Sequence, residues 1–389
     1  MKKWLSRNLI VLTLVSLAQD AASELLYPLL PYLITAGVIG AAPLALGVIE
    51  GCAEAAAGFT KLYSGKKSDA IGRKPFVIAG YSIAGLGKAL VIFGTVWSTI
   101  FLGRVTDRIG KGLRSAPRDA LIHDSVPHED VGKAFGFHRT GDNIGAVIGP
   151  LIALAGLSLL NDDVRAVAQW ALIPALLSGL LTLFVKETVR HRKQSTPYAE
   201  KTPLPGPLKK AIGILVLIQL TNIPDALLLL RLYDLDFSVQ GVVLIYALYS
   251  FVTVLFAFPG GYLADKWAPQ ITYAIGLLAF AIAYATLGLT SSKSIAVIAL
   301  VIYGIFPALT DGVGKAWIAK LSQPEQRGRA QGVYQASMNF AVLGAGIWGG
   351  ALWSKGETQP VLVVAALGAV IGAIFFTARF FREGFANRL

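Results

Sequence analysis

Two pairs of carboxylates stand four residues apart within otherwise apolar stretches, Asp20 with Glu24 and Glu50 with Glu54. Residues four apart are neighbours on a helix surface, so each pair shares a face. A carboxyl group held away from water without complete pairing can bind and release a proton near neutral pH. Asp20, Glu24 and Glu54 are therefore the first candidates for carrying protons. The other interpretation is that these carboxylates neutralise buried cations, and the sequence leaves both open.

A second cluster of ionisable residues brings His138, Arg139 and Asp142 within five positions. Histidine changes charge in the physiological pH range, so His138 is a candidate proton shuttle, although a membrane histidine also commonly satisfies a single hydrogen bond. The complete set of proton-coupling candidates is Asp20, Glu24, Glu50, Glu54, Arg104, Asp142 and His138.

Charged residues also follow helical spacing between positions 104 and 118, where Arg104, Asp107, Arg108, Lys111 and Arg118 form one stripe. Each charge near the bilayer centre costs roughly 3 kcal/mol, so the stripe cannot face lipid. It forms either an internal ladder of salt bridges or, at Arg108 and Lys111, part of a substrate site. The candidates for lining a substrate cavity are Arg108, Lys111, Asp107, Arg139, Lys88, Asp225, Arg231, Asp311 and Lys315.

The segments that carry these residues are too apolar for a water-soluble protein. Of the 389 residues, 54% are hydrophobic and 15% are charged, and apolar runs of about 20 residues recur along the chain. Because backbone groups in lipid must be paired internally, these runs predict helices rather than the alternating strands of a barrel. The expected spans are 8–36, 42–64, 76–94, 98–121, 135–158, 168–186, 209–234, 240–260, 271–289, 295–319, 332–353 and 360–381.

Lysine and arginine concentrate in alternate loops, which places both termini and the long central loop in the cytoplasm by the positive-inside rule. The central loop at 187–208 is rich in charge and proline, as is typical of a linker. The sequence therefore predicts a six-helix N-terminal bundle at 1–186 and a six-helix C-terminal bundle at 209–389. The net charge of +12 then reports membrane topology and not a nucleic-acid partner.

Several sequence features recur at a nearly constant offset between the two predicted bundles. Gly65 and Asp69, separated by three residues, match Gly261 and Asp265, and two further motifs recur at similar spacing. Such a repeat predicts two pseudo-symmetric bundles related by an axis normal to the membrane, with a substrate cavity between them.

The hairpin at 65–74 resembles the signature motif of the major facilitator superfamily, although Lys67 and Ala70 stand where Leu and Arg are usual. The resemblance implies an all-α membrane fold of twelve helices that alternates access by rocking of its halves. It also implies that Arg104, despite Asp107 in place of the usual Gln, takes part in proton coupling. The residues that the resemblance assigns to a conformational latch are Gly65, Asp69, Gly72, Arg73, Gly261 and Asp265.

Gly136, Gly145, Gly149 and Pro150 resemble the antiporter motif of drug-efflux members of this superfamily, without its final pair of glycines. The resemblance implies export rather than uptake. Glycines also let two helices approach closely, and close packing alone would account for them.

No cofactor and no metal site is predicted. Cys52 is the only cysteine, so neither an intramolecular disulfide nor a cysteine metal cluster is possible. His123 and His128 fall beside acidic residues in a predicted cytoplasmic loop, which is more typical of a solvated turn than of a metal site. No phosphate-binding loop or catalytic constellation is present either, so we expect no enzymatic activity and transport driven by an ion gradient.

The sequence thus predicts an antiporter that exports a small organic solute in exchange for protons across a bacterial-type inner membrane. Its expected partners are a small-molecule substrate, protons and membrane lipid, and a monomer is the simplest expectation. The alternative is uptake or exchange of a small anionic metabolite at a cationic wall made of Arg104, Arg108, Lys111 and Arg139. Neutralisation of these cations by Asp107 and Asp142 would weaken that alternative. A non-transporting receptor or assembly factor with the same fold is a third possibility.

Overall fold

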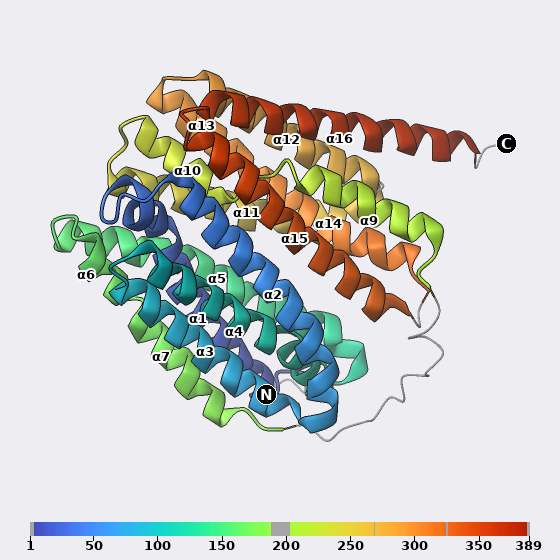
Figure 1. The fold of residues 1–389 in the computed structure, drawn as a ribbon. Helices are drawn as coiled ribbons and strands as arrows, with labels where there is room; N and C mark the ends of the chain where they lie inside the picture. Colours follow the sequence, from blue (N-terminus) through green and yellow to red (C-terminus); the bar gives the residue numbers. More distant parts are fainter. Residues whose placement is uncertain (1–3, 188–202, 268, 324–325, 387–389) are drawn as a thin grey trace. The chain divides into compact units, whose positions relative to one another are not determined.

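The computed structural model describes residues 4–187, 203–267, 269–323 and 326–386. Within these ranges the chain forms helices and no strands (Figure 1), which confirms the predicted all-α class. The chain divides into two compact units, Met1–Gln194 and Ser195–Leu389. Most of the linker predicted at 187–208 lies outside the described residues.

The N-terminal unit begins with a helix whose start and end follow from its sequence. Ser6 accepts a hydrogen bond from the Leu9 amide and so caps the helix, and Pro28 and Pro31 end its regular hydrogen bonding. The helices are α1 (Arg7–Leu26), α2 (Pro43–Ile71), α3 (Arg73–Phe93), α4 (Trp97–Asp124), α5 (Val131–Leu159), α6 (Val164–Gln169) and α7 (Leu172–Leu181), with 3-10 turns at Tyr27–Leu29, His128–Asp130 and Thr182–Phe184 and a π turn at Tyr32–Ala36.

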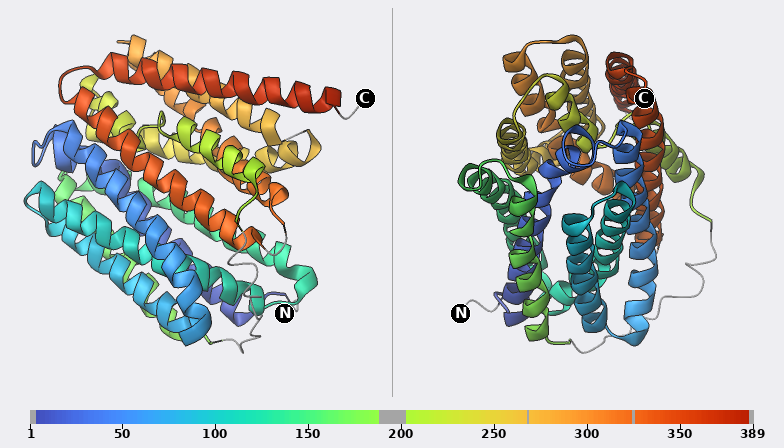
Figure 2. Two further views of the ribbon diagram at one scale, coloured as in Figure 1. Left: turned by 45° about the vertical axis from the view of Figure 1, so that its right-hand side comes forward. Right: turned by 60° about the vertical axis from the view of Figure 1, so that its left-hand side comes forward.

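Within this unit α4 packs against α2 and α3, and α1 packs against α5 and α7 (Figure 2). Glycines make the contact between α3 and α4 unusually close. A Cβ atom at Gly87 would lie 2.6 Å from the Gly103 carbonyl oxygen, and one at Gly103 would lie 2.7 Å from the Gly87 carbonyl oxygen. Because the two backbones touch, charged side chains on α4 reach partners on both neighbouring helices.

The C-terminal unit contains two helices that are broken where the sequence predicts continuous spans. Pro224 disfavours helix in the residue before it, and the predicted span at 209–234 forms two helices. Pro307 lacks an amide donor and lies in the first turn after a second break, within 295–319. The helices are α9 (Gly206–Gln219), α10 (Asp225–Asp234), α11 (Val239–Lys266), α12 (Pro269–Leu289), α13 (Lys293–Tyr303), α14 (Ile305–Leu321), α15 (Arg327–Trp353) and α16 (Thr358–Ala386).

Among the described residues, eight helical segments are long and apolar enough to cross a membrane. The predicted spans at 42–64, 98–121, 209–234 and 332–353 are not among these eight. The stripe of charge lowers the hydropathy of α4, and the break divides the span at 209–234 into helices of 14 and 10 residues. A helix or helix pair occupies each of the twelve predicted spans, and the count of twelve membrane crossings stays a prediction.

Candidate functional site

Four charged side chains form a closed cluster where α4 packs against α2 and α3. Arg104 donates to both carboxylate oxygens of Glu50, with Nε···Oε1 and Nη2···Oε2 distances of 2.7 Å. Lys88 Nζ lies 2.6 Å from Asp107 Oδ1, and Asp107 Oδ2 lies 3.5 Å from Arg104 Nη1. Each of the four side chains is at most 4% exposed. The cluster fixes three helices against one another, because separating one member would leave a buried charge without its partner.

A more open ion pair lies one turn further along α2 and α4. Arg108 Nε lies 3.1 Å from Glu54 Oε1, and the two side chains are 13% and 27% exposed. Lys111, on the next turn of α4, is exposed. The predicted stripe is therefore largely an internal ladder of ion pairs. Lys88 was expected to line a substrate cavity. Its ammonium group is buried against Asp107, and the cavity role stays a prediction.

A second, incompletely paired group lies where α5 packs against α1. His138 Nε2 lies 3.6 Å from Asp142 Oδ1, and both atoms are buried without a hydrogen-bond partner. The other ring nitrogen of His138 lies 3.4 Å from Thr13 Oγ1 on α1. Arg139 is 72% exposed, and its Nη1 lies 4.0 Å from Asp142 Oδ2. A proton added to His138 would turn the loose contact with Asp142 into an ion pair.

Asp20 on α1 and Arg118 on α4 adjoin this His138–Asp142 pair. The Cβ atom of Asp20 lies 3.2 Å from the position of a Cβ at Gly145, which is about one turn beyond Asp142 on α5. Arg118 Nη1 donates to Ser16 Oγ on α1 at 3.0 Å, and its charge interacts with those of Asp142 and Asp20. Glu24, one turn after Asp20, is partly buried.

Glycines set the distance between α1 and α5. A Cβ at Gly145 would lie 2.5 Å from the Leu17 carbonyl oxygen, and one at Gly149 would lie 2.6 Å from the Ala21 carbonyl oxygen. Pro150 follows and is buried. Close packing at Gly136 was also expected and is wrong within this unit, because nothing lies within 4 Å of a Cβ there. Nine residues from Gly136 to Gly145 make about two and a half turns, so the two glycines lie on opposite faces.

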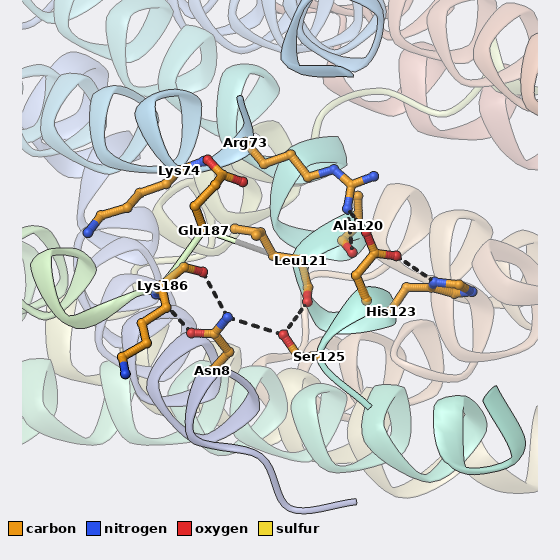
Figure 3. A network of polar contacts seen from close by, with 10 residues as sticks. Asn8, Arg73, Lys74, Ala120, Leu121, His123, Ser125, Lys186 and Glu187 are labelled. Carbon is orange, nitrogen blue, oxygen red and sulfur yellow. Dashed lines mark hydrogen bonds and ion pairs between the residues drawn. The ribbon is translucent and has the colours of Figure 1, made fainter. Parts of the chain in front are cut away.

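At the α2–α3 hairpin, Gly72 joins the helices with a φ of 131°, which residues with a side chain rarely adopt. Arg73 donates to the Ala120 carbonyl oxygen at 3.0 Å and pairs with Asp124 at the end of α4 (Figure 3). Burial opposes ionisation of Asp124, but hydrogen bonds from His123 and Arg73 and the Arg73 charge outweigh it and lower the Asp124 pKa below 3.8. The hairpin is thus tied to α4 within its own unit.

Further polar contacts join helix ends at the same end of the unit (Figure 3). Asn8 of α1 donates to the Lys186 carbonyl oxygen at 2.8 Å and to Ser125 Oγ at 3.2 Å, and accepts from the Lys186 amide at 2.9 Å. Glu187 accepts from the Lys74 amide at 2.9 Å, at the start of α3. These bonds connect α1, α3, α4 and the segment that follows α7.

The expected latch aspartates, Asp69 and Asp265, have side chains that lie outside the described residues. Gly65 and Gly261, the glycines of the same two sequence motifs, have space around them. The nearest atom to a Cβ at Gly65 would be the Ala116 Cβ at 3.7 Å, and nothing lies within 4 Å of a Cβ at Gly261. Close packing within the units therefore does not account for these two glycines.

In the C-terminal unit, Asp225 is the first residue of α10, directly after the break in the helix. It accepts hydrogen bonds from the hydroxyl groups of Tyr249 at 2.9 Å and Tyr303 at 2.8 Å. The sequence indicated Asp225 by its charge alone. It gave no signal for the tyrosines, because they are distant in sequence and aromatic residues are common throughout an apolar chain.

The other charged candidates of this unit have different surroundings. Arg231 donates to the carbonyl oxygens of Leu287 and Thr290, both at 3.1 Å, at the end of α12. The guanidinium thus caps a helix end, and its expected place on a cavity wall stays a prediction. Asp311 and Lys315 lie on the exposed face of α14.

Comparison with known proteins identifies the family. The sequence profile described as Major Facilitator Superfamily matches residues 12–233 and 211–388. The chain belongs to the Major Facilitator Superfamily. It is therefore a multi-pass membrane transporter, as the hairpin motif implied.

Relatives of this transporter include a multidrug resistance protein. It is 28% identical to an MFS-type transporter of Methanocaldococcus jannaschii over 95% of this chain and 94% of the relative. It is 24% identical to the multidrug resistance protein MdtH of Klebsiella pneumoniae over 87% of this chain and 85% of the relative. The crystal structure of a D-xylose-proton symporter matches with a TM-score of 0.77 at 18% identity, covering 95% and 96% of the two chains, which shows the shared fold alone.

Proposed function

We propose that this transporter exports a small solute in exchange for protons, and that the His138–Asp142 pair binds the coupling proton. The observation that carries the proposal is the pair of buried, unpartnered atoms, His138 Nε2 and Asp142 Oδ1, 3.6 Å apart. Their geometry suits one added proton, which would join them by a charge-assisted hydrogen bond.

The position of the pair explains how a proton would act on conformation. His138 and Asp142 lie on α5 beside α1, and the two helices touch through Gly145 and Gly149. Asp20 and Arg118 contribute charge to the same place, so adding or removing a proton changes the balance between α1, α4 and α5. A change of charge at a contact between helices is a direct way to favour one of two arrangements.

The paired charges have a different role in this proposal. Glu50, Arg104, Asp107 and Lys88 hold one another in short contacts that are closed to water, so they serve as a clamp between α2, α3 and α4. Glu54, which the sequence ranked among the first proton carriers, is bound to Arg108 and is a weaker candidate than Asp142. Asp20 stays a candidate proton carrier because it adjoins the His138–Asp142 pair. Glu24 stays a candidate because it lies one turn from Asp20.

Export is favoured over uptake by two observations. The similarity to MdtH extends over most of both chains, and MdtH is a multidrug resistance protein. The alternative of anion uptake depended on a cationic wall, but Arg104 and Arg108 are bound to Glu50 and Glu54. An arginine already bound to a carboxylate is a poor anion site, because the anion would have to displace that partner.

The positive-inside rule supports the proposed orientation, with both termini in the cytoplasm of a bacterial-type cell and the chain in its inner membrane. The polar network around Arg73 and Asn8 then lies at the cytoplasmic end of the N-terminal unit, and the latch role of the hairpin belongs to the same proposal.

The test uses purified protein in proteoliposomes loaded with a pH-sensitive dye. A pH gradient is imposed, pools of cationic, neutral and anionic solutes are added in turn, and lumenal pH is followed. We expect one pool to produce proton flux that the Asp142→Asn and His138→Gln variants lose. Glu54→Gln is the matched control and should retain coupling. Solute movement without proton flux, unchanged in Asp142→Asn, would overturn the proposal.

A further inference from the structure

The helix α7, at the edge of the N-terminal unit (Figure 1), has an apolar face that the unit leaves uncovered. It packs on α1 and α3 through the face that carries the buried residues Ala175 and Ser178. On the opposite face Leu176, Leu180 and Leu183 are 65%, 60% and 59% exposed. Because apolar side chains on the outside of a membrane helix contact lipid, acyl chains run along this face.

Two lysines lie where this apolar face ends. Lys74, at the start of α3, donates from Nζ to the Leu183 carbonyl oxygen at 3.3 Å. Lys186 follows the turn that ends α7, and its side chain is exposed. Asn8 binds the Lys186 amide at 2.9 Å and its carbonyl oxygen at 2.8 Å, which fixes the backbone there. Figure 3 shows both ammonium groups on the same side of this polar network.

These two lysines differ from other cations at the same end of the unit, because no carboxylate pairs with them. Arg73 and Lys133 are each bound to an aspartate. Among the described residues, no carboxylate lies within ion-pair distance of the Lys74 or the Lys186 ammonium group. Glu187 is the next residue in the sequence, but its carboxylate accepts from the Lys74 amide at 2.9 Å. Both ammonium groups can therefore bind an anion from outside the chain.

We propose that this end of α7 binds an anionic phospholipid such as phosphatidylglycerol, with the phosphate between Lys74 and Lys186 and an acyl chain along Leu180 and Leu183. A phosphodiester carries one negative charge and accepts strong hydrogen bonds from ammonium groups. Basic sites between membrane helices at the cytoplasmic side bind anionic headgroups, and the proposed orientation places this end there. The inference does not depend on proton exchange, because the site contains neither residue of the His138–Asp142 pair.

Two other interpretations of these lysines make different predictions. If their charge serves only to orient the chain in the membrane, every lysine at this end of the unit is equivalent for lipid binding. If the ammonium groups bind a free phosphate compound, the apolar face of α7 contributes nothing to affinity. The test therefore compares one lysine with another, and one headgroup with and without its acyl chains.

The experiment measures binding to the purified full-length protein in detergent by native mass spectrometry. The probes are phosphatidylglycerol, phosphatidylcholine with the same acyl chains, and glycerophosphoglycerol, which is the first headgroup without chains. We expect wild type to bind phosphatidylglycerol at least about tenfold more tightly than either other probe. Lys74→Gln and Lys186→Gln should each lose about fivefold in affinity for it. Lys133→Gln, which removes a cation already paired with Asp130, is the matched control and should bind as wild type does.

Equal affinity of wild type for the two lipids would overturn the inference without any variant. Equal affinity for glycerophosphoglycerol would also overturn it, because the acyl chains would then contribute nothing. Lys186→Gln is the decisive variant, since the Lys186 side chain is exposed and its bonds to Asn8 involve only the backbone. Unchanged phosphatidylglycerol affinity in this variant, or an equal loss in Lys133→Gln, would show that the lipid does not bind at the end of α7.

Discussion

Two groups of charge in the N-terminal unit differ in how completely they are paired. Around α4, Glu50 and Arg104 share two hydrogen bonds of 2.7 Å, and Lys88 and Asp107 share one of 2.6 Å. Between α1 and α5, His138 and Asp142 face each other at 3.6 Å without a hydrogen bond between them. The same unit thus holds buried charges that are fully paired and buried groups that one added proton would bring together. We call the first group the clamp, because it holds three helices together, and the His138–Asp142 pair the switch, because one proton would change its contact.

The clamp should fail most severely when one partner loses its charge. Glu50→Gln leaves the buried Arg104 without its carboxylate, so we expect the free energy of unfolding to fall by about 3–5 kcal/mol. Unfolding in mixed detergent and sodium dodecyl sulfate micelles measures this change. Glu54→Gln, which removes the same charge from a pair with 13% and 27% exposed side chains, should cost less than Glu50→Gln because water partly solvates the Arg108 that is left. Equal losses of unfolding free energy in the two variants would show that the two ion pairs contribute equally to stability.

The next largest effect concerns the contact between α1 and α5. In Gly149→Ala the new Cβ would meet the Ala21 carbonyl oxygen at 2.6 Å, so the helices must separate. We expect a loss of about 1–3 kcal/mol in the same unfolding measurement. Gly136→Ala is the control, because space is open there and alanine favours helix by up to about 1 kcal/mol. A loss at Gly136 as large as that at Gly149 would contradict the assignment of the packed face.

The switch should respond in the opposite way to the clamp. Asp142→Asn removes a buried acceptor atom that has no donor, so we expect the free energy of unfolding to change by less than about 1 kcal/mol. Proton flux in proteoliposomes should nevertheless be lost. A loss of stability as large as that of Glu50→Gln would place Asp142 in the clamp and remove it as a proton carrier.

The sequence predicted the helices and the family better than it predicted the partners of each charge. Apolar runs and the 65–74 hairpin were sufficient for the all-α fold, because span length and loop motifs are local properties. The sequence did not decide which carboxylate binds Arg104, because Glu50 and Glu54 share a helix face. Only the crossing of α2 and α4 selects between them. The tyrosines around Asp225 were not predicted at all, because their contacts depend on where three helices meet.

The smallest effect concerns the hairpin contact between Arg73 and Asp124, which lies at the end of α4 rather than inside the unit. The pKa of Asp124 is lowered in the folded protein from its ordinary value of 3.8, so the ionised carboxylate stabilises the fold. This contribution is complete above pH 3.8 and is lost as pH falls through the lowered pKa. Because both side chains are partly exposed, we expect Asp124→Asn to cost less than about 1 kcal/mol at pH 7.

The difference in thermal unfolding between wild type and Asp124→Asn, followed from pH 7 downward, isolates this group from all other carboxylates. It should shrink steadily below pH 3.8 and approach zero once Asp124 is protonated in both states. A difference that does not depend on pH would mean that the side chain acts through packing and not through its charge. The hairpin would then be held by the bond from Arg73 to the Ala120 carbonyl oxygen, which carries no ionisable acceptor.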